Sequence, residues 1–236
     1  MAERPGSPLV DLAAPQGVAV ELELPATGSQ ALRDHVVDVL RERIVSGQLE
    51  PGTRLRERAL SQEFGVSRVP IREAILVLEQ QRLLATEPRV GATVTRLTAR
   101  DVTELFDVRL AFEPLTARLA ARSRTEQDLA ALDQHHAAAR SAAAAGDAPG
   151  GSRANAAFHR DLIMASHSEM LQQVVGPLDS IIQRLFRHTI TRHEQDLCRD
   201  HEQVLQAVRD RDEELAAFWA TRHVETTREH SIALFH

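Results

Sequence analysis

The 236-residue chain contains no lysine, a single cysteine, Cys198, and a single asparagine, Asn155. One cysteine excludes an internal disulfide framework and a cysteine-based zinc finger, and it fits a reducing compartment. No apolar run approaches the ~18 residues that a membrane span needs. The start MAERPGSPLV lacks the basic-then-apolar order of a signal peptide. We therefore expect a soluble, cytoplasmic protein with no membrane partner, in which any metal is held by histidine and carboxylate side chains.

Charge is distributed unevenly along the chain. Because lysine is absent, all 28 basic residues are arginine, and the formal net charge is -6. Residues 31–96 hold 11 arginines against 9 acidic residues, whereas residues 97–236 hold 16 arginines against 21 acidic residues. Only the first block can approach a polyanion without net repulsion. Its excess is small, so charge alone does not indicate nucleic acid.

Hydrophobic periodicity predicts a tail and two domains. Residues 1–30 show no sustained period, which predicts a disordered tail. Within residues 31–96, helical periods run over residues 31–47, 56–64 and 67–82, and two short apolar runs on either side of residues 88–91 predict a hairpin. The expected fold class is mostly α: an N-terminal winged helix-turn-helix, with three helices and a small β-hairpin, followed by an all-α helical bundle over residues 97–236.

The bundle itself contains no convincing strand and no internal repeat. Residues 146–151 form its clearest break. The periodicity predicts six or seven helices, at residues 99–122, 125–144, 153–166, 169–174, 176–192, 196–209 and 212–234.

The third helical segment of the first domain carries the residues expected to bind DNA. The second helix of a helix-turn-helix lies in the major groove, with the polar side chains of its first turn on the base edges. Ser67, which can cap this helix, and Arg68 and Arg72, which lie one turn apart, occupy those positions. An arginine can bond O6 and N7 of one guanine, and Arg58 in the preceding helix can hold a phosphate. The alternative interpretation is a solvated arginine-bearing face.

The run PGTRLRERALSQEFGVSRVPIREAILVLEQQRLL, followed by PRVGATV, resembles the DNA-binding domain of GntR-family transcription regulators. The resemblance implies that Arg58, Ser67, Arg68 and Arg72 contact an operator, and that the wing glycine Gly91 approaches the minor groove. It also implies a homodimer on palindromic double-stranded DNA.

Three histidines fall on the inward stripes of three different predicted helices of the bundle. His159 lies one turn after Asn155 on the predicted helix 153–166. His201 lies on the inward stripe of helix 196–209, and His223 lies on that of the last helix, 212–234. A metal site in a helical bundle needs ligands that converge from several helices. The alternative is that each histidine is a hydrogen-bonded core residue.

The stretch from about residue 97 to residue 224, with FDVRLAFE and NAAFHRDL, looks like the FCD effector-binding and dimerisation domain of the FadR subfamily. That resemblance implies a divalent metal, with zinc or nickel as the first candidates, on His159, His201 and His223. The family has an aspartate where this chain has Asn155. An asparagine offers only a neutral oxygen, so the site keeps more net positive charge and favours an anionic effector that completes the coordination.

A carboxylate is the natural anionic effector for such a site. Arg109 lies on the inward stripe of its helix, where an arginine can clamp a carboxylate through two parallel hydrogen bonds. An internal ion pair with Glu113, one turn later, is the competing interpretation of Arg109. His188 shares a stripe with apolar residues and is a further candidate for the cavity wall, whereas Arg160 is expected to point elsewhere.

Three functions are compatible with these residues. The first is a transcription regulator, repressor or activator, whose operator binding responds to a small carboxylate. The second is a metalloregulator in which the divalent metal itself is the signal. The third is a metal-dependent hydrolase, which lacks a marked general base because no HExxH-type spacing is present. We therefore expect a regulator and not an enzyme.

Overall fold

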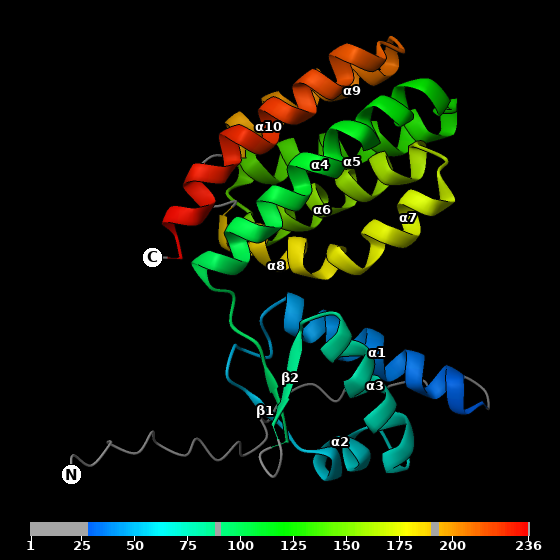
Figure 1. The fold of residues 1–236 in the computed structure, drawn as a ribbon, viewed down its shortest axis with the longest axis vertical. Helices are drawn as coiled ribbons and strands as arrows, with labels where there is room; N and C mark the ends of the chain where they lie inside the picture. The colour runs from blue at the N-terminus through cyan, green and yellow to red at the C-terminus, as the bar shows by residue number, and fades with distance from the viewer. Residues whose placement is uncertain (1–27, 88–90, 190–193, 236) are drawn as a thin grey trace.

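The computed structural model describes residues 28–87, 91–189 and 194–235, without the side chains of residues 188–189 and 194–197. The predicted tail lies outside the described residues, except for its last positions, which already belong to the first helix. Figure 1 shows a small N-terminal body below a larger helical body. The predicted fold class is confirmed: a winged helix-turn-helix with a small antiparallel sheet precedes a helical domain.

The N-terminal body consists of three helices and a three-stranded sheet. Its elements are α1 (Ser29–Val45), β1 (Arg54–Leu55), α2 (Glu57–Glu63), α3 (Arg68–Gln80), β2 (Leu84–Glu87) and β3 (Gly91–Val94). The predicted hairpin pairs Leu84 with Val94 and Glu87 with Gly91. The strand β1 pairs with the other edge of β3. It was not predicted, because two residues are too few to show a period.

The core of this body follows from the predicted helical stripes. Side chains of α1 and α3 form one buried cluster with the inner faces of the strands. Pro70 sits in the first turn of α3, where its missing N–H costs no intrahelical bond. The stripe of α3 is buried at Ile71, Ala74, Ile75 and Leu78, so the opposite face of this helix is left to the solvent.

The described part of residues 97–236 forms a bundle of seven α-helices and one 3-10 turn. Its elements are α4 (Ala99–Ser123), α5 (Glu126–Ala145), α6 (Ala148–Ala165), α7 (Glu169–Val175), η1 (Gly176–Leu178), α8 (Asp179–Thr189), α9 (Glu194–Arg209) and α10 (Glu213–Ala233). Capping boxes at Thr98 and Thr125 start α4 and α5. No helix among the described residues is long and apolar enough to cross a membrane.

The predicted break at residues 146–151 is wrong in its second half. Gly146, with φ +66°, ends α5 in the left-handed conformation that helix ends commonly use. The chain then turns directly into α6, because Asp147 accepts a hydrogen bond from the Gly150 N–H, and Pro149 lies in the first turn. Capping therefore outweighs the poor helix propensity of two adjacent glycines. The predicted segment at 176–192 likewise begins as a 3-10 turn, and its end falls partly outside the described residues.

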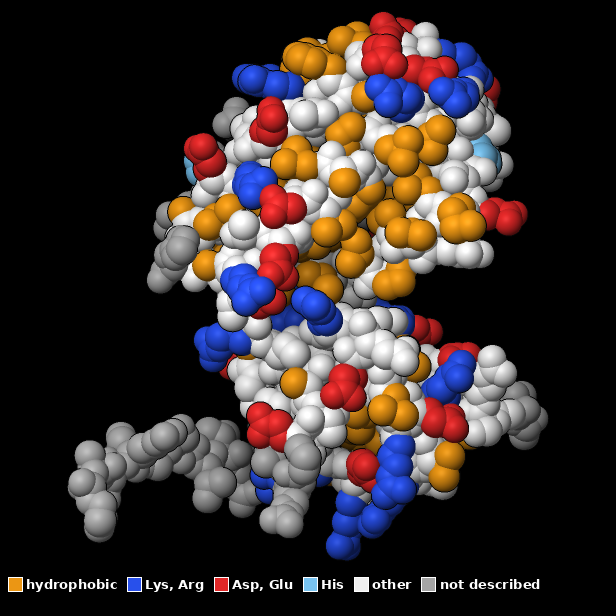
Figure 2. All heavy atoms as spheres, in the orientation of Figure 1, with side chains coloured by type: hydrophobic (Ala, Val, Ile, Leu, Met, Phe, Trp, Pro, Cys, Tyr) orange, Lys and Arg blue, Asp and Glu red, His pale blue; other side chains and the backbone are white. Residues whose placement is uncertain are grey.

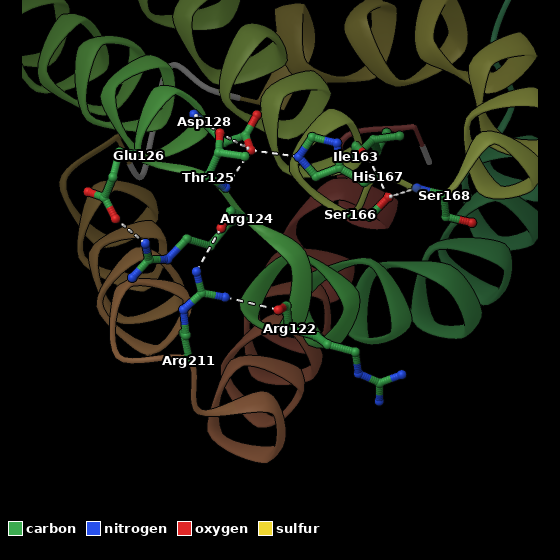
Figure 3. A network of polar contacts seen from close by, with 10 residues as sticks. All are labelled: Arg122, Arg124, Thr125, Glu126, Asp128, Ile163, Ser166, His167, Ser168 and Arg211. Atoms are coloured by element: carbon green, nitrogen blue, oxygen red, sulfur yellow. Dashed lines mark hydrogen bonds and ion pairs between the residues drawn. The ribbon is translucent and has the colours of Figure 1, made fainter.

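Three turns at the far end of the bundle are joined by polar contacts (Figure 3). Arg211, between α9 and α10, donates to the carbonyl oxygens of Arg122 and Arg124, at 2.9 and 3.0 Å. Asp128, in the first turn of α5, accepts from Thr125 and contacts Nε2 of His167 at 2.7 Å. The Arg211 contacts satisfy backbone carbonyls at the end of α4, which a helix end leaves without partners. They hold the end of the bundle that is remote from the N-terminal body.

The helix α8 connects the bundle with the N-terminal body. Arg184 is buried and donates to Oγ1 and the carbonyl oxygen of Thr95, at 2.9 and 2.5 Å. Arg187 donates to the carbonyl oxygen of Ser46, at the end of α1, at 2.8 Å. Gly47 makes room for this side chain, because a Cβ there would lie 1.2 Å from Nη1 of Arg187.

Candidate regulatory and metal-binding sites

The start of α3 presents polar side chains to the solvent. Ser67, Arg68 and Arg72 are all exposed, whereas the opposite stripe is buried. Ser67 occupies the predicted N-cap position, but its hydroxyl makes no capping hydrogen bond. The hydroxyl and the Arg68 guanidinium are thus placed where a recognition helix would meet base edges. Their contact with DNA stays a prediction.

The remaining predicted DNA contacts lie around this face. Arg72 forms an ion pair with Glu57 of α2, 2.8 Å long and exposed, which a base or phosphate would have to replace. Arg58 is exposed on α2. Gly91 begins β3 with φ +97°, a left-handed conformation that a side chain would strain. The wing tip, residues 88–90, lies outside the described residues.

The three predicted histidines converge in the interior of the bundle. His159 comes from α6, His201 from α9 and His223 from α10, and one nitrogen of each lies within 4.8 Å of the others. Nε2 of His201 lies 3.4 Å from Nε2 of His223. Nε2 of His159 is buried without a hydrogen-bond partner; Nδ1 of His223 has none either, but it faces Asp200. Buried polar atoms without partners are rare in proteins, so Nε2 of His159 is a candidate ligand atom.

One of the three nitrogen separations suits a tetrahedral metal ion, whereas the His159 nitrogen lies within 4.8 Å of the other two. Two nitrogens that each lie about 2.0–2.1 Å from tetrahedral zinc are about 3.3–3.4 Å apart, close to the separation of the His201 and His223 nitrogens. Burial lowers the pKa of His159 to about 3 and lowers that of His201 well below its ordinary value. Neutral imidazoles carry the lone pair that a metal ligand needs.

Carboxylates flank two of the histidines on the side away from their shared centre. Oε2 of Glu113 lies 3.7 Å from Nδ1 of His159, and Oδ2 of Asp200 lies 3.8 Å from Nδ1 of His223. Metal-binding histidines commonly direct the second ring nitrogen toward a carboxylate, which orients the ring. Asn155 is buried on α6, one turn before His159. Its part in a metal site stays a prediction.

Arg109 and Glu113 form a buried ion pair, as the competing interpretation of Arg109 predicted. Nε of Arg109 donates to Oε1 of Glu113 at 2.5 Å, and both side chains are buried. Burial by itself would raise the pKa of Glu113, but the Arg109 charge and then the His159 ring bring it below its ordinary value. Nη2 of Arg109 is nevertheless buried without a partner. Arg109 is not among the lining residues of the cavity beside His159, so its contact with a carboxylate effector stays a prediction.

A narrow cavity with room for little more than one water molecule lies beside His159. Glu113 and Arg160 are among its lining residues, so the expectation that Arg160 points elsewhere is wrong. The side chain is long enough to reach the mouth although its helical position faces the solvent. No periodicity could have shown this. His188 lies on α8, but its side chain is outside the described part of the chain.

Two family models match the chain. The model for bacterial regulatory proteins of the gntR family covers residues 32–94, and the FCD domain model covers residues 104–226. Among curated proteins, the HTH-type transcriptional regulator YdhC of Bacillus subtilis is 30% identical over 81% of this chain and 87% of its own length. The gluconate operon transcriptional repressor of Bacillus subtilis is 32% identical over 75% of each chain.

Solved structures share the fold at low sequence identity. Escherichia coli McbR/YncC has a TM-score of 0.76 and 22% identity, over 87% of this chain and 99% of the other. A GntR regulator of Rhodococcus has a TM-score of 0.74 and 23% identity, over 85% and 97%. The winged helix with exposed arginines on α3, the helical domain behind it and both family matches agree: the chain belongs to the GntR family of bacterial regulatory proteins and carries an FCD domain.

Proposed function

We propose that this protein is a transcription regulator of the FadR subfamily whose operator binding responds to a small carboxylate held beside a divalent metal. The convergence of His159, His201 and His223 within 4.8 Å, inside an FCD domain, is the observation that carries the proposal. Zinc and nickel both suit a nitrogen-rich site. The unpartnered Nε2 of His159 and the cavity beside this residue place an anionic effector next to the histidine cluster.

One relative, a gluconate operon repressor, supports a carboxylate effector. The chain is 32% identical to a gluconate operon repressor, and gluconate is a hydroxycarboxylate that can bind a metal through two oxygens. Such a ligand would complete the coordination that three histidines leave open. We take D-gluconate as one probe of the effector class and not as the effector.

A homodimer is part of the proposal, because a palindromic operator needs two recognition helices. The outer face of α4 and α10 exposes apolar side chains (Figure 2). They include Val108 and Leu115 on α4, two turns apart, and Leu215 and Phe218 on α10, and Phe218 is 54% exposed. Apolar surface that gathers on one face of a monomer is typical of protein interfaces.

Native mass spectrometry of the freshly purified protein tests the proposal. We expect a dimer with one metal ion per chain, and loss of that metal in His201→Ala. His230→Ala is the control, because His230 is an exposed histidine on the same helix as His223. A dimer that carries no metal after dialysis against zinc and against nickel contradicts the metal site. A monomer contradicts the dimer.

The metalloregulator alternative is favoured by one observation: the cavity beside His159 has room for little more than one water molecule. This conformation leaves no room beside the histidines for an organic ligand. Titrating operator affinity with metal in the absence of any metabolite separates the two functions. A steep response supports metal sensing, whereas constant affinity leaves the metal as the anchor of a carboxylate.

A further inference from the structure

An ion pair between α6 and α8 closes the cavity beside His159. Nη1 of Arg160 lies 3.4 Å from Oδ2 of Asp179, the first residue of α8, and both residues line the cavity. The two side chains are 51% and 30% exposed, so this ion pair is weak and exchanges readily. Asp179 also accepts a hydrogen bond from Gln183 at 2.7 Å. It therefore keeps one partner when Arg160 leaves.

A carboxylate ligand cannot enter the cavity while this contact is closed. The cavity has room for little more than one water molecule. All of its walls contribute to the apolar cores, α7 through Leu171 and Val175. The outer side of α7 is nevertheless solvent-exposed at Met170 and Val174, and Asp179 at the start of α8 is partly exposed. The junction of α7 and α8 is therefore the part of the wall where we place the opening.

The same helix contacts both the metal site and the DNA-binding domain. The Phe186 ring lies 5.2 Å from the His159 ring, and the Arg109 guanidinium lies 5.2 Å from the Phe186 ring centroid. On either side of Phe186, Arg184 holds Thr95, directly after β3, and Arg187 holds Ser46, at the end of α1. A movement of α8 cannot leave these contacts unchanged, because close-packed elements transmit displacement.

We propose that a carboxylate of the effector binds Arg160 in place of Asp179, and that the ligand, for which the closed cavity has no room, displaces α8 and so changes the Arg184 and Arg187 contacts that hold the DNA-binding domain. The inference rests on the proposed function and adds to it the anion-binding residue and the route of the signal. Arg160 suits the role because a guanidinium binds a carboxylate through two parallel hydrogen bonds. Coupling follows because the effector binds the open arrangement better than the closed one.

The first experiment measures ligand binding. Zinc-loaded protein is titrated calorimetrically with formate, acetate, citrate and D-gluconate. We expect Arg160→Gln to bind the best of these probes at least about tenfold more weakly, because a charge-assisted hydrogen bond is lost. Asp179→Asn should bind it more tightly, since the competing carboxylate is gone. Arg153→Gln is the control, because Arg153 is exposed on α6 but does not line the cavity.

The outcomes separate this inference from the proposed function. If the wild type binds a probe and Arg160→Gln binds it equally well, the role of Arg160 is overturned while the carboxylate effector stands. If the wild type binds none of the four probes at concentrations up to about 10 mM, the carboxylate effector fails, and this inference fails with it.

The second experiment measures the signal on operator DNA that the wild-type protein selects from random duplexes. Arg187→Gln should keep the probe affinity within about twofold but lose the probe-induced change in operator affinity. Asp179→Asn should reach the same change in operator affinity at a lower probe concentration, because it binds the probe more tightly. A wild-type response in Arg187→Gln overturns the route through α8.

Discussion

Replacing Arg109 with methionine should strongly destabilise the helical domain. Arg109 is 1% exposed and Glu113 is 5% exposed, and they share a hydrogen bond of 2.5 Å. The guanidinium also stacks on Phe106 and Phe186, at 4.8 and 5.2 Å, and a flexible thioether can fill part of that space. The variant leaves Glu113 buried without its cation. Breaking a buried ion pair in this way costs about 3–5 kcal/mol.

The assay is urea unfolding at pH 7, followed by circular dichroism, with a chelator present so that metal binding does not contribute. The double variant Arg109→Met/Glu113→Leu removes both charges and should recover most of the loss, to within about 1–2 kcal/mol of the wild type. The reasoning is refuted if the single variant lies within about 1 kcal/mol of the wild type. It is equally refuted if the double variant is as unstable as the single one.

Three further predictions concern other parts of the molecule. Arg68→Ala and Arg72→Ala should each lose about 1–3 kcal/mol of discrimination between the correct and the wrong base at one base pair. Arg58→Ala should instead weaken binding to all sequences alike. Competition assays with specific and random duplexes distinguish the two effects. Gly47→Ala should reduce the melting temperature and displace Arg187, because φ is +82° and a Cβ would meet that side chain; calorimetry of the variant checks this. Burial alone would raise the pKa of Asp128, but hydrogen bonds from Thr125 outweigh it and lower the pKa. The contribution of Asp128 to stability is therefore present above about pH 4 and is lost as the pH falls further. Asp128→Asn should therefore remove part of the acid sensitivity seen in unfolding curves, and an unchanged pH profile would contradict this.

The sequence predicted features that repeat with the helical period. Arg68 and Arg72 lie on the exposed face of α3 because four-residue spacing places them opposite the buried stripe. His159, His201 and His223 were expected to face inward for the same reason, and the structure brings them together. The predicted capping role of Ser67 was right in position and wrong in its hydrogen bond. A position along a helix is a local property, whereas a hydroxyl contact depends on rotamer.

Features without a period escaped the sequence analysis. The start of α6 was missed, because an Asp147 cap and an early proline outweigh two glycines. The strand β1 exists because its two residues meet the free edge of β3, and a stretch that short carries no alternation of its own. Arg160 reaches the cavity through a long side chain, which helical position does not reveal. Each of these features depends either on a contact with residues distant in the chain or on a helix cap that outweighs local helix propensity.

The sequence by itself determined the order of the main helices and the hairpin, their buried faces and the family. Those follow from local periodicity, turn chemistry and the GVSRVPIREA run. Only the tertiary structure decided that Arg109 is paired with Glu113, that the three histidines converge within 4.8 Å, and that α8 joins the cavity to the DNA-binding domain. The reason is physical: periodicity states which face of a helix is buried, but distances between side chains of different helices are set by how those helices pack.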